Sequence, residues 1–244
     1  MRYQLRESEA PAEPDADGVA RRRLFDAATG CSTFSQRVLE LGTGRSAERV
    51  DAGSDEVLYV LDGEATIDIA GESHAVGPGT AVYIAGGTAW SADVPEQLKV
   101  LSVLVHEPQG GGATHAVIDL GAAGMQGATA GRQFTLGATP DVGCESVTQF
   151  IGFIPPGRAP DHFHKYDEVV YVLDGEGVLS IGGEDAPLHA GVCVHLPARL
   201  VHCLANTGEE TMHVLGVFRP AGSPAEAYYP DGTLAVVPSY GAEA

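Results

Sequence analysis

The chain has 244 residues, and its 33 acidic residues against 14 lysines and arginines give a formal net charge of −19 and a pI near 4.6. Such an acidic chain repels phosphate backbones and anionic lipid headgroups, so nucleic acid and membrane surfaces are excluded as expected partners. No apolar stretch approaches the roughly 18 residues that cross a bilayer, and the N-terminus MRYQLRESEAPAEPDADG is polar where a signal peptide is apolar, so the sequence predicts a cytoplasmic protein.

The abundance of turn residues predicts an all-β fold. The chain contains 32 glycines and 15 prolines between short runs of valine, isoleucine, leucine and tyrosine. A chain of this length can form one large β domain or two domains of about 100 residues each. Residues 1–27 are interpreted as an N-terminal arm that is partly disordered, because the stretch 8–18 (SEAPAEPDADG) is acidic and proline-rich.

An internal repeat divides the rest of the chain. The segment VLYVLDGEATIDIAGESHAVGPGTAVYIAGGTAW (57–90) aligns without a gap with VVYVLDGEGVLSIGGEDAPLHAGVCVHLPARLVH (169–202), at an offset of 112 residues. Each copy alternates apolar and polar residues between Asp-Gly and Gly-Gly turns, which predicts a small antiparallel barrel. We expect a first barrel at 28–108, a linker at 109–130, a second barrel at 131–220 and a tail at 221–244 without assignable elements.

Ligand-type side chains open the second copy. His162 and His164 are separated by one residue, so in a strand they share one face, and Glu168 keeps that parity. His202 follows Pro197 in PARLVHCLAN, where a returning strand can bring it beside the other three. Three imidazoles and one carboxylate suit divalent Fe, Mn, Co, Ni, Cu or Zn, and leave two open positions on an octahedral ion. The spacing therefore predicts a metal site.

The same residues resemble the two sequence motifs of the cupin superfamily. Gly157, His162, His164, Glu168 and Gly175 resemble the first motif, G-x(4,5)-H-x-H-x(3,4)-E-x(6)-G, and Gly191, Pro197, His202 and Asn206 resemble the second, G-x(5)-P-x(4)-H-x(3)-N. Together with the repeat, the chain resembles a bicupin. The resemblance implies two jelly-roll barrels of the double-stranded β-helix type, with a metal held by His162, His164, Glu168 and His202. Arg199 departs from the family pattern, because it replaces the second glycine of the usual Pro-x-Gly.

The first copy has lost most of this pattern. Counted back from Glu56, the two histidine positions fall at Val50 and Ala52, within a shift of one residue, and Trp90 replaces the late histidine. One carboxylate without imidazoles does not hold a transition metal tightly. We expect one divalent metal per chain, in the second barrel, and a first barrel partly filled by Trp90.

His195 is the candidate catalytic residue outside the metal set. Its parity relative to Pro197 is compatible with a place in the same cavity, as an acid or base near neutral pH, and equally with a hydrogen-bonded place in the wall. The other histidines match no ligand pattern and are interpreted as surface or wall residues: His74, His106, His115, His189 and His213. The four cysteines show no Cys-x-x-Cys spacing and are interpreted as reduced core thiols.

Three functions are compatible with such a site. The first hypothesis is an O2-using dioxygenase acting on a small enol, keto or carboxylate substrate, as the resemblance to cupin dioxygenases implies. The second is a non-redox isomerase, decarboxylase or hydrolase; ureidoglycine aminohydrolases resemble the chain in length, but their ligand order differs. The third is a non-enzymatic bicupin that binds a small molecule. An enzyme is favoured because open metal positions are typical of catalytic sites, and a homodimer is expected because exposed sheet edges commonly pair.

Overall fold

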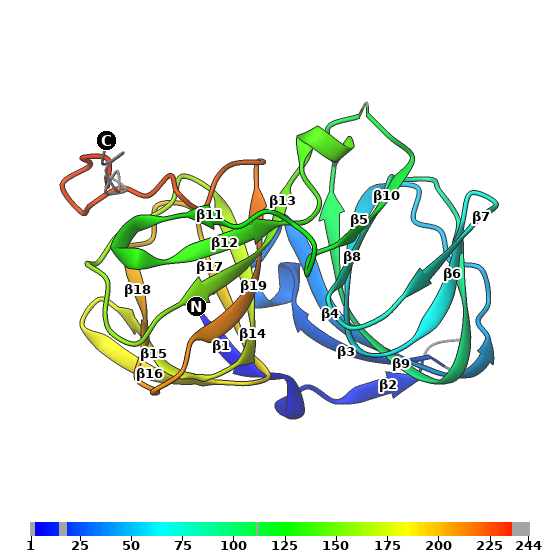
Figure 1. Ribbon diagram of the computed structural model, residues 1–244, viewed down its shortest axis with the longest axis horizontal. Helices are drawn as coiled ribbons and strands as arrows, with labels where there is room; N and C mark the ends of the chain where they lie inside the picture. Colours follow the sequence, from blue (N-terminus) through cyan, green and yellow to red (C-terminus); the bar gives the residue numbers. More distant parts are fainter. Residues whose placement is uncertain (1–2, 15–18, 111, 236–244) are drawn as a thin grey trace, which may run out of the picture.

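The protein consists of two β-barrels that lie side by side along the long axis of the molecule (Figure 1). The computed structural model describes residues 3–14, 19–110 and 112–235. The helices in these ranges are single 3₁₀ turns: η1 (Glu7–Glu9), η2 (Ala27–Thr29), η3 (Thr129–Gly131) and η4 (Pro140–Val142). None of the helices in the described ranges is long and apolar enough to cross a membrane. The prediction of an all-β fold with two tandem barrels is confirmed.

A nine-stranded sheet forms the N-terminal barrel. Its strands are β2 (Ala12–Pro14), β3 (Ala20–Phe25), β4 (Phe34–Arg45), β5 (Ser54–Gly63), β6 (Ala65–Ile69), β7 (Glu72–Val76), β8 (Thr80–Ile84), β9 (Trp90–His106) and β10 (His115–Asp119). The order is β10-β8-β5-β9-β4-β3-β2, with β6 added through β9 and β7 through β6. Since β9 pairs with β6 at its start and with β5 further on, one long strand joins the two layers of the barrel.

Two sheets form the C-terminal barrel. Its strands are β11 (Gln126–Gly127), β12 (Gln133–Leu136), β13 (Thr148–Ile154), β14 (Asp167–Asp174), β15 (Glu176–Ile181), β16 (Glu184–His189), β17 (Val192–Leu196), β18 (His202–Asn206) and β19 (Met212–Arg219), together with β1 (Gln4–Arg6). The larger sheet has the order β1-β17-β14-β19-β13-β12-β11, and the smaller one β16-β15-β18. A hydrophobic cluster with residues from both sheets fills the space between them.

Alternation along the strands decides which core a side chain joins. On β14, Val170 and Val172 point into the C-terminal barrel, whereas Val169 and Tyr171 join a second cluster that lies between the barrels. The equivalent strand β5 does the same, with Leu58 inside the N-terminal barrel. Each repeat therefore has its own interior and contributes one face to a shared core.

The predicted arm and linker both contain strands. In the arm, β1 pairs with β17 and β2 pairs with β3, while residues 15–18 lie outside the described ranges, so the predicted boundaries stay predictions. The linker at 109–130 contains β10, which pairs with β8, and β11, which pairs with β12. These short strands are ordered because they complete the hydrogen bonding of sheet edges.

Two glycines of the repeat are dictated by the backbone. Gly63 and Gly175 end β5 and follow β14, with φ angles of 83° and 86°. A Cβ at Gly63 would lie 2.0 Å from the carbonyl oxygen of Gln97, and one at Gly175 would lie 2.7 Å from Cα of Met212. Only glycine allows this turn at this approach to the neighbouring strand.

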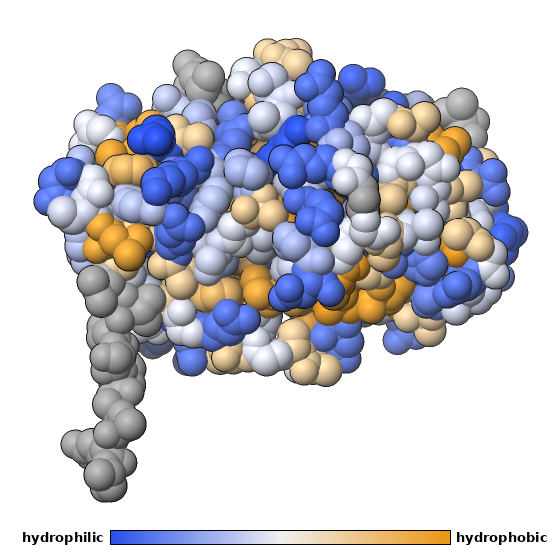
Figure 2. Space-filling view, turned by 90° about the horizontal axis from the view of Figure 1, so that it is seen from above, coloured by the Kyte–Doolittle hydropathy of each residue, from blue (hydrophilic) through white to orange (hydrophobic). Residues whose placement is uncertain are grey.

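Figure 2 shows hydrophilic side chains interspersed with hydrophobic ones over one face of the molecule. Large hydrophobic side chains that are more than half exposed are few in the described ranges: Val50, Met125 and Leu234. The mixture fits a well-solvated acidic chain. The homodimer and the cytoplasmic location stay predictions.

Candidate metal centre

Three histidines converge in the C-terminal barrel. His162 and His164 lie in the extended segment before β14, and His202 is the first residue of β18. The backbones of His162 and His202 pair through two N–H to carbonyl hydrogen bonds of 3.0 and 2.8 Å, which places their side chains next to each other. One ligand nitrogen from each of the three rings lies within 4.8 Å of the other two. The structure therefore brings these three predicted ligands together.

Backbone carbonyl groups fix the tautomer of each ring. The Nδ1 atoms lie 2.9, 2.9 and 2.8 Å from carbonyl oxygens, of Pro160 for His162, Glu226 for His164 and Leu200 for His202. A carbonyl oxygen only accepts, so each Nδ1 carries the proton and donates it. Each Nε2 then keeps a free lone pair, which is the form of histidine that binds a transition metal.

Burial keeps the three imidazoles neutral. Desolvation is the main cause that lowers the pKa of His162, lowers that of His164 to about 4 and lowers that of His202 well below its usual value. Mutual repulsion of the rings acts in the same direction on His164 and His202. At neutral pH the three rings are therefore unprotonated at Nε2, so a metal ion would not first have to displace protons.

Glu168 shares the barrel interior with the histidines without joining their cluster. On β14 it has the parity of Val170 and Val172, and it is buried. Among the described residues, the cluster of ligand atoms within 4.8 Å of one another in this barrel consists of His162, His164 and His202. No carboxylate oxygen of Glu168 belongs to it. Burial raises the pKa of Glu168 to about 8, while Arg132 acts in the opposite direction. Its role as fourth ligand stays a prediction, which its inward direction supports.

The histidines face a small cavity of about 70 Å³. Its wall is mostly apolar and includes Phe134, Phe150 and Phe218. The charged side chain on this wall is Arg132, which donates from Nη2 to the carbonyl oxygen of Leu204. Burial lowers the pKa of Arg132 and the nearby charge of Glu168 acts in the opposite direction, although no carboxylate of a described residue lies within ion-pair distance of it. A guanidinium stays protonated under these conditions, so the cavity contains a buried positive charge.

Arg132 was missed by the sequence analysis. It stands just before β12, in a segment outside the repeat and outside both motifs. Its burial depends on the pairing of β12 with β13. The one available signal is a single arginine between glycine and a short apolar run, and that signal is too common to predict a site.

The tail covers the cavity. Pro224 and Ala227 line its wall, and Tyr228 forms a backbone bridge with Phe163, the residue between the two ligand histidines. The tail was expected to have no assignable element, and it contributes no named strand. Its carbonyl group at Glu226 nevertheless accepts the Nδ1 proton of His164. Residues 236–244 lie outside the described ranges.

Arg199 adopts the conformation that the glycine of the family pattern favours. Its φ is 67°, in the left-handed region where a side chain costs about 1 to 2 kcal/mol. The backbone N–H of Arg199 donates to the carbonyl oxygen of His164 at 2.8 Å. The loop that contains Arg199 is therefore hydrogen-bonded to the segment that contains His162 and His164.

His195 lies on the other face of β17. Val194 and Leu196 point into the C-terminal barrel, so His195 between them points toward the shared core, as Cys193 does. Its Nε2 lies 2.9 Å from Oδ1 of Asp167, and its ring contacts Phe25. His195 is absent from the described lining of the cavity. Its catalytic role stays a prediction without support from this placement.

In the N-terminal barrel, an ion pair of Glu56 with Arg37 occupies the place that corresponds to the histidine cluster of the C-terminal barrel. The backbone of Arg49 forms an antiparallel bridge with Trp90, just as that of His162 does with His202. Arg49 is therefore the structural counterpart of His162, one residue before Val50 and within the predicted shift of one. Trp90 is buried, as expected, and its Nε1 donates to Glu56 at 3.0 Å. Arg37 donates to the other oxygen of Glu56 at 3.0 Å, and Ser102 also donates to that oxygen.

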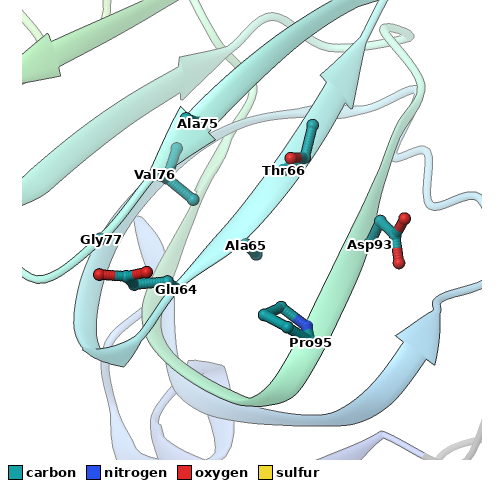
Figure 3. Close-up of a pocket in the computed structure, with 8 residues that line it drawn as sticks. All are labelled: Glu64, Ala65, Thr66, Ala75, Val76, Gly77, Asp93 and Pro95. Carbon is teal, nitrogen blue, oxygen red and sulfur yellow. The ribbon is translucent and has the colours of Figure 1, made fainter.

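Larger hollows lie elsewhere on the molecule. One of about 620 Å³ lies on the N-terminal barrel over the neighbouring strands β7, β6 and β9 (Figure 3). Its polar side chains are Glu64, Thr66 and Asp93, without a histidine or a cysteine in the described lining. It is a surface hollow rather than a candidate active site.

A family model described as a cupin domain matches the chain twice, at residues 37–104 and 150–218. Each match falls within one barrel, and together they cover more than half of the chain.

Two curated proteins are related over shorter stretches. The chain is 34% identical over 71 residues to the polyketide synthase CurC of Streptomyces cyaneus, which covers 28% of this chain and 46% of that protein. It is 34% identical over 67 residues to an oxalate-binding protein of Thermotoga maritima, which covers 26% of this chain and 54% of that protein. The chain thus spans about half the length of the curated relatives it matches.

Solved structures share the fold over most of the chain. A Pseudomonas aeruginosa protein described as glyoxylate-induced matches with a TM-score of 0.76 and 19% identity, over 88% of this chain and 87% of that one. A single-residue variant of Bacillus subtilis oxalate decarboxylase matches with a TM-score of 0.72 and 14% identity, over 89% of this chain and 77% of that one. At these identities the likeness concerns the fold.

Proposed function

The chain belongs to the cupin domain family, and from this premise we propose that its C-terminal barrel holds one divalent transition metal and uses it on a small substrate that carries a carboxylate. The observation that carries the proposal is the buried guanidinium of Arg132 on the wall of the cavity that the three histidines face. Glu168 acts on this charge without forming a close ion pair, so a bound anion is favoured as a closer partner of the guanidinium. The cavity thus combines donors for a metal with a donor for a carboxylate.

The residues present fit a metal ion. Three neutral imidazoles with converging Nε2 lone pairs match the nitrogen-rich set preferred by Fe, Mn, Co, Ni, Cu and Zn. His162, His164 and His202 hold the ion in our proposal, with Glu168 as the fourth ligand. When bound, such an ion supplies Lewis-acid polarisation of a substrate oxygen and, for a redox-active metal, electron transfer to O2.

The chain's own residues bind and orient the substrate. Arg132 pairs with the substrate carboxylate and thereby directs the rest of the molecule toward the histidines. Phe134, Phe150 and Phe218 exclude water, which strengthens the attraction between the guanidinium and the carboxylate. The carbonyl groups that accept the Nδ1 protons hold the rings in place.

The size of the cavity limits the substrate. Its volume of about 70 Å³ is far below the roughly 300 to 1,000 Å³ of pockets for drug-sized ligands. We therefore propose a small keto, enol or dicarboxylic acid rather than a flavonol. The partial similarity to an oxalate-binding protein supports this class. For the reaction we propose O2-dependent cleavage, because the apolar wall accommodates O2 beside the acid.

Two alternatives have specific support. The single polar anchor, Arg132, also suits non-redox decarboxylation or isomerisation, which needs a fixed carboxylate and a Lewis acid but no O2. The enclosed cavity and the oxalate-binding relative suit a binding protein without turnover.

Metal analysis combined with a substrate panel tests the proposal. The protein, purified without a metal affinity column, is assayed with oxalate, glyoxylate, pyruvate and acetoacetate in the presence and absence of O2. We expect His202→Ala to lower the metal content by one ion per chain and Arg132→Met to keep the metal but lose carboxylate binding. Turnover without O2 would favour non-redox chemistry, and tight binding without turnover would favour the binding protein. Unchanged metal content in His202→Ala would refute the ligand set.

A further inference from the structure

Three side chains of the N-terminal barrel that matched no sequence pattern lie together in the structure. Nε2 of His74 lies 3.2 Å from Nε2 of His115, and Oε2 of Glu72 lies 3.9 and 3.6 Å from these two nitrogens. Their ligand atoms all lie within 4.8 Å of one another. The cluster is remote in sequence from the ligand residues of the C-terminal barrel.

The strands aim these side chains at a gap in the barrel. His74 has the parity of Val76 on β7, and His115 has the parity of Val117 on β10; both valines pack on the core of the N-terminal barrel. β7 and β10 are edge strands, each hydrogen-bonded to one neighbour only among the described strands. The two histidines therefore face each other across the opening between two unpaired sheet edges.

The distances suit a tetrahedral metal. Two donors about 2.0 to 2.1 Å from one tetrahedral ion lie about 3.3 Å apart, close to the 3.2 Å between the two Nε2 atoms. The Glu72 side chain is 70% exposed, so a change of its rotamer can bring its oxygen closer by the few tenths of an ångström that remain. The Nδ1 atom of His115 lies 3.2 Å from the hydroxyl group of Thr114, a partner that fixes the ring.

We propose that Glu72, His74 and His115 form a second metal site, which takes Zn²⁺ or a similar ion and links the edges β7 and β10. Water completes the coordination on the exposed side. The equivalent gap of the C-terminal barrel has Ala186 in place of His74 and is bridged instead by a hydrogen bond from Gln4 to the carbonyl oxygen of Pro187, 2.6 Å long. A mutual hydrogen bond of the two imidazoles is the competing explanation of their 3.2 Å separation.

Zinc binding by a chain without the C-terminal site tests this proposal independently of the proposed function. Untagged protein carrying His162→Ala and His202→Ala is titrated with Zn²⁺ in competition with a chromophoric chelator. We expect one Zn²⁺ per chain, and a higher melting temperature with zinc than without. Adding His74→Ala or His115→Ala should abolish both effects, and adding Glu72→Gln should weaken binding.

His189→Ala is the matched control, because this half-buried histidine lies outside both clusters and its Nδ1 contacts the carbonyl oxygen of Ala190 at 3.0 Å. It should leave zinc binding unchanged. In the otherwise unmodified chain, His74→Ala should lower the zinc capacity from two ions to one. This second measurement remains decisive even if the variant with His162→Ala and His202→Ala folds poorly. Zinc uptake that is undiminished by His74→Ala in both backgrounds would mean that the histidines are only hydrogen-bonded to each other.

Discussion

Glu56 and Glu168 occupy equivalent positions of the repeat in different surroundings. Glu168 lies in the interior that contains three neutral histidines, whereas Glu56 accepts hydrogen bonds from Arg37, Trp90 and Ser102. The guanidinium of Arg37 thus provides the first barrel with the positive charge that a metal provides in our proposal for the second. A cation thus compensates the buried carboxylate of the first barrel, and in our proposal the metal does the same in the second.

Arg37→Ala should destabilise the protein by about 3 kcal/mol, because it leaves the charge of Glu56 buried without its partner. Urea unfolding measures the loss of free energy. Adding Glu56→Gln to Arg37→Ala is the control: it removes the unpaired charge and should recover part of the loss, and Glu56→Gln should leave the metal content unchanged. A cost below about 1 kcal/mol for Arg37→Ala would show that the pair behaves like a surface ion pair.

The cysteines should be inert in the folded chain. All four are buried, and burial raises the pKa of Cys31 and of Cys144 to about 12. At pH 8 these two thiols stay protonated, and a thiol reacts only as the thiolate. We expect a coloured disulfide reagent to label no cysteine of the native protein within minutes and all four in denaturant. Rapid labelling of the native chain would contradict the buried arrangement.

The three clustered histidines could be predicted from local spacing. His162 and His164 are one residue apart and so share a face, and His202 follows Pro197, where a returning strand brings it beside them. Local spacing could not predict Arg132, whose burial depends on strand pairing outside the repeat. It was undecided on His195, because parity alone does not say which face of β17 is inside; the neighbours Val194 and Leu196 settle that only once the cores are known.

At the scale of elements, the segment 223–228 is the part of the tail that reaches the site. Within this segment, the carbonyl group of Glu226 accepts the Nδ1 proton of His164, and the backbone of Tyr228 pairs with that of Phe163. Removing a hydrogen-bond partner of a metal-binding histidine typically lowers metal affinity about 10- to 100-fold.

A chain that ends at Gly222 should therefore bind its C-terminal metal about 10- to 100-fold more weakly than the full chain. Chelator competition measures the difference. A chain that ends at Ala235 keeps the whole described segment and should bind like the full chain. Equal affinities of the two truncated chains would show that the tail does not support His164.

The repeat identified the two barrels, because hydrophobic alternation and Gly turns recur in both copies. The strands β1, β10 and β11 escaped prediction. They are short, and each acquires its conformation by pairing with an edge strand that is distant in sequence or outside the repeat. The alternation of apolar and polar residues indicates which face of a strand is buried, but it does not indicate which distant strand pairs with it.

At the scale of the molecule, the shared core joins the barrels. It contains Val57 and Leu101 from the first barrel, Val169 and Leu215 from the second, and Leu5 from β1. Glu7 adds polar contacts to both barrels, with Lys99 at 2.7 Å and with the hydroxyl group of Tyr171. Neither barrel can unfold without exposing this apolar surface of the other.

Heating should therefore give one cooperative calorimetric transition for the metal-free chain, with equal calorimetric and van't Hoff enthalpies. Loading the C-terminal site should raise the melting temperature of the whole molecule rather than of one half. Two resolved transitions would mean that the shared core does not couple the barrels.

The pairing of β1 with β17 also sets an order of events during synthesis. β1 leaves the ribosome well before its partner Val192–Val194, which is made almost 190 residues later. At about 5 to 20 residues per second, that interval lasts roughly 10 to 40 seconds. During this time the first barrel can form while β1 is left without a partner, and only the synthesis of β17 allows β1 to join the sheet of the second barrel.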